Sequence, residues 1–267
     1  MIPAWQLALL ALAGLGALFA AFLPVCRRID NYGFVDVAWS YAFIPLAWFY
    51  AAAGDGWLPR RLVLATMVTV WSARLGAHLL GRVAAHHPQE DGRYQQLRRD
   101  WAGGFAPRMA GFFQLQAASV VFLGLPFLLP VFHQADGWSP WEFIGSGLWL
   151  AALAGESRAD SQLARFKRDP ANRRRVCDAG LWRYSRHPNY FFEWLVWVAY
   201  AVFALGSPRG WAGFLAPGAI LFLLLRVTGI PLTEGQAVRS KGAAYRRYQA
   251  TTSAFIPWFP KTNPPSP

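Results

Sequence analysis

The chain has 267 residues, of which 55% are hydrophobic, 16% are aromatic and only 15% are charged. Soluble domains carry about 25% charged residues, so a water-soluble globular protein is not expected. The formal net charge of +12 would suit a nucleic-acid-binding protein, but the arginines lie between apolar blocks, which fits anionic lipid headgroups better. We therefore expect membrane lipids, and no nucleic acid, as partners.

Seven apolar blocks are long enough to cross a bilayer, whose hydrocarbon core requires about 20 residues per helix. They lie roughly at residues 3–25, 34–53, 61–81, 110–132, 139–156, 189–206 and 210–230. The first block is too long for a signal-peptide core and has no basic region before it. The sequence thus predicts an all-α, polytopic integral membrane protein with about seven transmembrane helices. These form one domain over residues 1–259, followed by a flexible tail at 260–267.

Lysines and arginines gather in alternate connections, after the first, third, fifth and seventh blocks. They include Arg27, Arg28, Arg82, Arg93, Arg98, Arg99, Arg158, Arg165, Lys167, Arg173, Arg174, Arg175, Arg246 and Arg247. Because basic segments face the cytoplasm, the N-terminus is predicted outside and the C-terminus inside. Cys26 and Cys177 both fall on the cytoplasmic side, so neither a disulfide nor a structural metal site is expected.

Two ionisable residues occur within early blocks, where a charge is costly and usually faces the bundle interior. Asp36 lies at the start of the second block, close to Trp39 and Tyr41. Arg74 lies more than one turn inside the third block, where it could meet an anion. The structural alternatives are an interfacial cap for Asp36 and a guanidinium that snorkels to headgroups for Arg74.

Beyond the fifth block, Glu156, Asp160 and Lys167 fall on one helical stripe at spacings of four and seven residues. This spacing predicts that the helix continues into the cytoplasm. A stripe of this kind is often only a solvated face. A dense polar cluster follows the stripe in the sequence, so we consider the stripe as part of a ligand site.

The densest polar cluster is the segment 180–194, which reads GLWRYSRHPNYFFEW. Pro188 suits the first turn of a helix, whose free amides bind phosphate oxygens well. Arg186 and His187 would add charge-assisted contacts to an anionic ligand, and Asn189 and Glu193 share one face of the helix. The structural alternative is a juxtamembrane basic clamp for lipid.

The run from Arg186 to Tyr190, followed by Glu193, resembles the C-terminal domain of steroid 5-alpha-reductase-like membrane proteins, particularly their bacterial relatives. The resemblance covers roughly residues 150–259. It extends to the stripe from Asp160 to Lys167, to residues 178–182 and 229–234, and to the closing 245–248 and 255–257 segments.

This resemblance implies a reductase of an activated carbon–carbon double bond that uses NADPH and acts on a lipid-like, steroid or isoprenoid-type enone in the bacterial inner membrane. The expected cofactor-binding residues are Arg74, Asp160, Lys167, Arg186, His187, Asn189, Arg226 and Glu234. The expected catalytic residues are Asp36, Tyr190 and Glu193. A proton donor for the developing enolate oxygen would be Tyr41, Tyr190 or an Asp36 that burial keeps protonated.

Two other functions stay open on the sequence. The same Arg-His-Pro-aromatic pattern occurs in membrane methyltransferases that resemble isoprenylcysteine carboxyl methyltransferases, where it lies beside S-adenosylmethionine. This chain has Thr233-Glu234 after its last block, whereas those enzymes typically have adjacent glutamates. A lipid-binding or transport protein without enzymatic activity is the third reading, although no inverted repeat is visible.

Overall fold

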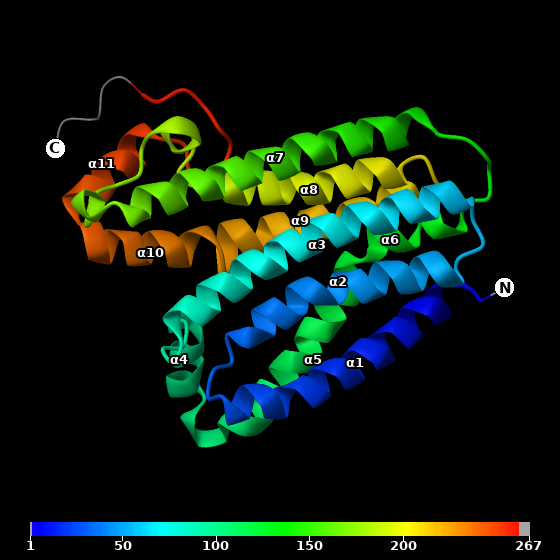
Figure 1. The fold of residues 1–267 in the computed structure, drawn as a ribbon, viewed down its shortest axis with the longest axis horizontal. Helices are drawn as coiled ribbons and strands as arrows, with labels where there is room; N and C mark the ends of the chain where they lie inside the picture. Colours follow the sequence, from blue (N-terminus) through cyan, green and yellow to red (C-terminus); the bar gives the residue numbers. More distant parts are fainter. Residues whose placement is uncertain (1, 262–267) are drawn as a thin grey trace. The chain divides into compact units, whose positions relative to one another are not determined.

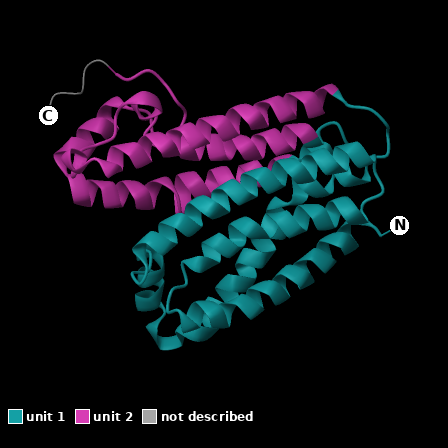
Figure 2. Cartoon of the chain, viewed as in Figure 1, with its two compact units in different colours: residues 1–139, 204–213 teal, residues 140–203, 214–267 magenta. Residues whose placement is uncertain are grey.

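The structure, a computed structural model, describes residues 2–261 of the chain. The fold is all-helical, with 78% of the chain in helices and no strand in the described part (Figure 1). The chain forms two compact units, which Figure 2 shows in different colours. Unit 1 contains residues 1–139 and 204–213, and unit 2 contains residues 140–203 and 214–267.

Unit 1 is built from the first six α-helices. They are α1 (Ala4–Arg28), α2 (Phe34–Ala53), α3 (Leu58–His86), α4 (Gly92–Asp100), α5 (Phe105–Leu123) and α6 (Leu125–Leu128). The apolar blocks form α1, α2, α3 and α5 as predicted, and Arg27 and Arg28 in the last turn of α1 suit the negative end of that helix. The short, polar α4 lies in the basic connection after α3 and was not predicted.

The core of unit 1 lies where α2 packs along α3 and α1 packs along α5. Gly76 on α3 permits the close approach of α2, because a Cβ atom at this position would meet the ring of Tyr41 on α2. Phe43 fills the space between the helices and makes edge contacts with Trp39 and Trp71. Small residues that let helices approach closely are typical of membrane bundles.

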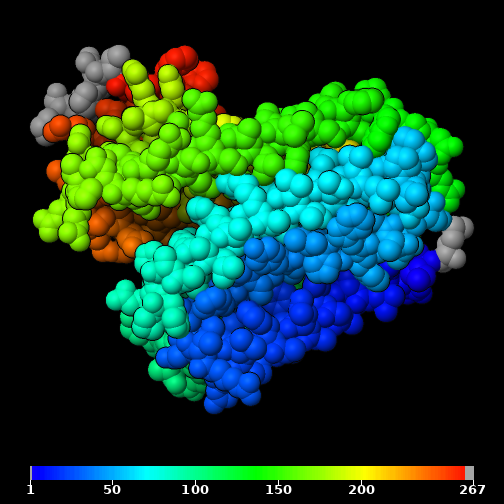
Figure 3. Space-filling view, in the orientation of Figure 1, coloured from blue at the N-terminus to red at the C-terminus, as the bar shows by residue number. Residues whose placement is uncertain are grey.

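Unit 2 is built from the remaining helices. They are α7 (Pro140–Arg168), α8 (Pro188–Ala204), α9 (Leu215–Phe222), a π-helical turn η6 (Leu223–Val227), α10 (Ile230–Lys241) and α11 (Ala243–Thr251), with 3₁₀ turns η3 (Pro170–Asn172) and η4 (Gly180–Arg183). Gly145 and Gly155 let α7 approach α8, because Cβ atoms there would meet Phe203 and the ring of Phe192. In the space-filling view, α7 forms much of the visible face of unit 2 (Figure 3).

Two local predictions are confirmed in unit 2. The helix that begins at Pro140 continues through the polar stripe to Arg168, and α8 begins at Pro188. Proline suits this first position because its missing N–H would have no partner inside the helix.

Within the described residues, four helical segments are long and apolar enough to cross a membrane: α1, α2, α3 and the run Gly210–Lys241. The bent pair Ala102–Leu123 and Leu125–Phe132 makes a fifth if it counts as one span. The other two predicted blocks are helical, but α8 has only 17 residues and α7 is charged from Glu156 onward. An integral membrane protein is thus supported, whereas seven crossings and the orientation of the termini stay predictions. Most of the predicted tail, residues 262–267, lies outside the described residues.

Candidate functional site

An ion pair between Arg186 and Glu234 holds the entry of α8 in place. The Arg186 Nε donates to Glu234 Oε1 at 2.6 Å, and its Nη1 donates to the backbone oxygens of Gln249, at 3.0 Å, and Thr252. The two charged side chains are only 10% and 15% exposed. This pair therefore joins the start of α8 to α10 and to the end of α11.

Two further donors complete the surroundings of Glu234. Its Oε1 lies 3.3 Å from His187 Nε2, and its Oε2 accepts from Gln249 Nε2 at 2.8 Å. Burial, together with the negative charge of Glu234, raises the pKa of the neighbouring Tyr245 to about 12. We predicted that Arg186, His187 and Glu234 contact the cofactor. In the structure these three side chains contact one another or neighbouring helices, so they have a scaffold role, and their contact with a cofactor stays a prediction.

A second group of polar side chains joins α7, α8 and α10. The amide of Asn189 donates to Asp160 Oδ1 at 3.2 Å, which links the α7 stripe to the first turn of α8. The hydroxyls of Tyr190 and Thr233 lie 3.1 Å apart, and the Tyr190 ring stacks on His187 with centroids 5.2 Å apart. We call Asp160, Asn189, Tyr190 and Thr233 the polar seam.

Three other predicted site residues of unit 2 lie on the same helices. Glu193, one turn after Asn189, accepts from the indole of Trp197 at 3.0 Å. Lys167, near the end of α7, and Arg226, in the π-helical turn, are both exposed. Neither cation forms an ion pair with another described residue.

Asp36 and Arg74 lie in unit 1. The carboxylate of Asp36 accepts from Arg93 Nη2 and from the Tyr94 hydroxyl, each at 2.7 Å, so it holds α4 against the start of α2. Burial, together with the charge of Asp36, raises the pKa of Tyr94 well above its usual range. Both oxygens of Asp36 are thus engaged as acceptors, which disfavours the predicted role as a proton donor. Arg74 is half-buried on α3.

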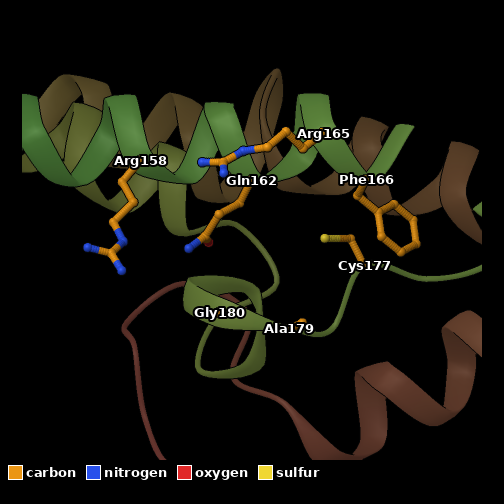
Figure 4. Close-up of a pocket in the computed structure, with 7 residues that line it drawn as sticks. All are labelled: Arg158, Gln162, Arg165, Phe166, Cys177, Ala179 and Gly180. Atoms are coloured by element: carbon orange, nitrogen blue, oxygen red, sulfur yellow. The ribbon is translucent and has the colours of Figure 1, made fainter. Parts of the chain in front are cut away.

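A groove of about 510 Å³ lies between α7 and the segment that leads into η4. It is lined by Arg158, Gln162, Arg165, Phe166, Cys177, Ala179 and Gly180 (Figure 4). Its volume falls within the range of roughly 300–1,000 Å³ that small-molecule sites occupy. Among the described residues, no group of histidines, cysteines and carboxylates is arranged to hold a metal ion.

Comparison with known proteins identifies the family. The DUF1295 family, described as a protein of unknown function, matches residues 22–252. This chain belongs to DUF1295. That family is steroid 5-alpha-reductase-like, so the coarse resemblance seen in the sequence is confirmed.

An uncharacterized protein of Schizosaccharomyces pombe is 26% identical to this DUF1295 chain over 227 residues. The aligned region is 74% of the chain and 63% of the yeast protein, so the chain spans less than two thirds of that relative. No solved structure matches. The DUF1295 match contains the polar seam, the Glu234 cluster (Arg186, His187, Glu234 and Gln249) and the Asp36 cluster (Asp36, Arg93 and Tyr94).

Several partners in these clusters were not predicted from the sequence. Arg93 and Tyr94 are 57 and 58 residues from Asp36, and Gln249 is 15 residues from Glu234. No local spacing indicates contacts of this kind. The groove residues Arg158, Gln162 and Arg165, by contrast, recur at intervals of four and three residues, which is a detectable helical signal.

Proposed function

We propose that this DUF1295 protein is a membrane-embedded, NADPH-dependent reductase of an activated carbon–carbon double bond in a lipid-like enone. The observation that carries the proposal is the hydrogen bond between Asp160 and Asn189. This bond connects the stripe from Asp160 to Lys167 with the run from Arg186 to Tyr190, the two segments on which the resemblance to the steroid reductases rests. Asp160 and Asn189 are 29 residues apart in the sequence. The polar seam therefore supports a shared ligand site on α7 and α8.

The donors and acceptors of unit 2 fit a phosphorylated dinucleotide. Lys167 and Arg226 are exposed cations that suit phosphate oxygens. Asp160 offers a carboxylate for ribose hydroxyls, and Asn189 and Glu193 offer an amide and a carboxylate for the nicotinamide end. Arg186 and Glu234 would support this site from behind rather than contact the cofactor.

NADPH, when bound, supplies a hydride to the alkene carbon beta to the carbonyl. The protein must then stabilise negative charge on the carbonyl oxygen and deliver a proton. We assign this donor to Tyr190. Its hydroxyl is held by Thr233 and its ring by His187, so the O–H group is oriented before substrate binds.

The test is a titration of the detergent-purified protein with NADPH, NADH and S-adenosylmethionine, followed by thermal unfolding. A ligand that binds only the folded state raises its stability by mass action. We expect a rise with NADPH alone. Lys167→Ala should weaken NADPH binding by about 10- to 100-fold, since a hydrogen bond to a charged group contributes about 1.5–3 kcal/mol. Asn189→Ala should weaken it by about 2- to 10-fold, since a hydrogen bond between neutral groups contributes about 0.5–1.5 kcal/mol.

Arg168→Ala is the matched control, because it removes an exposed cation from the same helix end without touching the seam. Unchanged affinity in both the Lys167→Ala and the Asn189→Ala variant would contradict the site. If S-adenosylmethionine binds and NADPH does not, the protein is assigned as a methyltransferase and not as a reductase. If neither ligand binds, a lipid-binding or transport role is favoured.

A further inference from the structure

The end of α7 carries a second polar stripe, which the proposed reductase does not use. Arg158, Gln162 and Arg165 lie two residues before or after members of the first stripe, and two residues turn a helix by about 200°. The second stripe therefore faces away from Asp160 and Lys167. Figure 4 shows Arg158 and Gln162 extending from α7 on the side of Ala179 and Gly180, and the side chain of Arg165 running along the helix.

The groove under this stripe is held in a fixed shape. Gln162 Oε1 accepts from the backbone N–H of Leu181 at 2.9 Å, and the indole of Trp182 donates to the backbone oxygen of Ala159 at 3.0 Å. Gly180 has a φ of +63°, and a Cβ atom there would meet the amide of Gln162. These contacts press η4 against α7, so the groove is a built feature of unit 2.

The groove is basic. Neither Arg158 nor Arg165 forms an ion pair or hydrogen bond with another described residue, and both are exposed. Burial raises the pKa of the Cys177 thiol; a backbone hydrogen bond at Ala179 opposes the rise, the charge of Asp178 adds to it, and Lys241 and Lys167 oppose it weakly. The two guanidiniums that line the groove, those of Arg158 and Arg165, outnumber the one carboxylate beside Cys177, that of Asp178. A planar guanidinium suits a phosphate, which it can bind through two parallel N–H donors.

The position of the groove along α7 points to the membrane surface. Trp141, at the start of α7, is 47% exposed, as expected for a residue of the aromatic belt. At about 1.5 Å per residue, Arg158 lies about 26 Å and Arg165 about 36 Å further along the helix than Trp141. A hydrocarbon core is about 30 Å thick. If α7 crosses the membrane, as the sequence predicts, Arg158 and Arg165 lie on the two sides of the far edge of that core, where their guanidiniums can reach headgroups.

We propose that the groove between α7 and residues 177–180 binds a phosphate group through Arg158 and Arg165, and that an anionic lipid headgroup is the favoured source of that phosphate. The site is separate from the polar seam and does not depend on the reductase activity. An anionic lipid bound there would hold the end of α7 and η4 at the membrane surface.

The experiment uses the full chain in an uncharged detergent. Apparent affinities are measured by thermal unfolding for phosphatidic acid in mixed micelles, with phosphatidylcholine as reference, and for inorganic phosphate at matched ionic strength. Arg158→Gln with Arg165→Gln should lower the affinity for phosphatidic acid by at least about tenfold. Arg168→Gln with Arg173→Gln removes the same charge outside the groove and should leave the affinity unchanged.

The outcomes separate the possibilities. Loss in the groove variant alone supports the site, and the ligand that shows it identifies lipid or free phosphate as the source. Equal losses in both double variants would reduce the effect to general electrostatic attraction and overturn the proposal. So would a loss of NADPH binding in the groove variant, because the site would then belong to the nucleotide. If the glutamine variant does not fold, Arg158→Lys with Arg165→Lys keeps the charge, loses the planar donors and should weaken binding.

Discussion

The carboxylate of Glu234 satisfies donors from three side chains. Arg186, His187 and Gln249 all converge on it, and they belong to the entry of α8 and to α11. A buried cation without its partner is costly, because its desolvation is no longer offset. One side chain of α10 therefore determines how two other segments are held.

Glu234→Gln should lower the stability of the protein by about 3 kcal/mol, the lower end of the range for removing one partner of a buried ion pair. The physical reason is that Arg186 stays largely buried while it loses its counter-charge. Thermal unfolding in detergent measures the change. Asp169→Asn is the control, since Asp169 is an exposed acid outside the cluster, and an equal shift in both variants would contradict the scaffold role.

Asp36 illustrates a residue whose partners decide its role. From the sequence, an acid at the start of an apolar helix was a candidate proton donor. In the structure its two oxygens accept from Arg93 and Tyr94, so it anchors a helix instead. The contact depends on how the connection after α3 folds back, and apolar periodicity carries no information about that.

At the scale of elements, α4 depends on a cap. Asp91 precedes this helix, and its side chain accepts from the backbone N–H of Arg93 at 3.0 Å. Burial opposes ionisation, but the Arg93 charge and its hydrogen bonds, with Arg82 further away, hold the pKa of Asp91 below its usual value. The ionised cap therefore stabilises the folded connection.

Asp91→Ala should cost about 1 kcal/mol, as loss of an N-cap usually does, and Asp91→Asn should cost less because it keeps the acceptor. A lowered pKa in the folded state means that the charge contributes fully above about pH 4 and is lost as the pH falls through the folded pKa. The difference between wild type and Asp91→Asn should therefore shrink from about pH 7 to about pH 3. Hydrogen exchange of the α4 amides measures it, and a difference that grows on acidification would contradict the assignment.

The apolar blocks were predictable because each is a long run that only a helix can bury in lipid. The continuation of α7 to Arg168 and the start of α8 at Pro188 were predictable from local rules of spacing and proline geometry. The π-helical turn at Leu223–Val227 was not, because its extra residue per turn leaves no mark on an apolar run.

At the scale of the whole molecule, the number of crossings depends on α7 and α8. If both cross the membrane, residues 133–139 and 169–187 lie on opposite sides of it. The sequence predicts this arrangement from the basic residues of the second segment. If neither helix crosses, the two connections lie on the same side.

Single cysteines test this arrangement directly. In a Cys26→Ser, Cys177→Ser background, Asp136→Cys and Arg173→Cys should react with a membrane-impermeant maleimide from opposite sides of oriented vesicles. Both positions are exposed. Lys261→Cys serves as a reference for the predicted cytoplasmic side. Labelling of Asp136→Cys and Arg173→Cys from one side would leave five crossings or fewer.

The candidate site was predictable in composition and only partly in geometry. Asp160, Asn189 and Tyr190 were named from the sequence and do lie together in the polar seam. Arg186, His187 and Glu234 were named too, but their partners tie helices to one another. Sequence spacing gives the face of a helix on which a residue lies, whereas its partner depends on packing between segments far apart along the chain.

The Glu234 cluster also bears on how such proteins are grouped. The Arg-His-Pro sequence at residues 186–188 lies where the start of α8 is joined to α10 and α11 by the contacts of Arg186 and His187. A shared scaffold supports different reactions when the residues around the ligand change. A search for the Arg-His-Pro motif therefore finds proteins that share this helix packing. Enzymes that transfer hydride and enzymes that transfer methyl groups can both contain it.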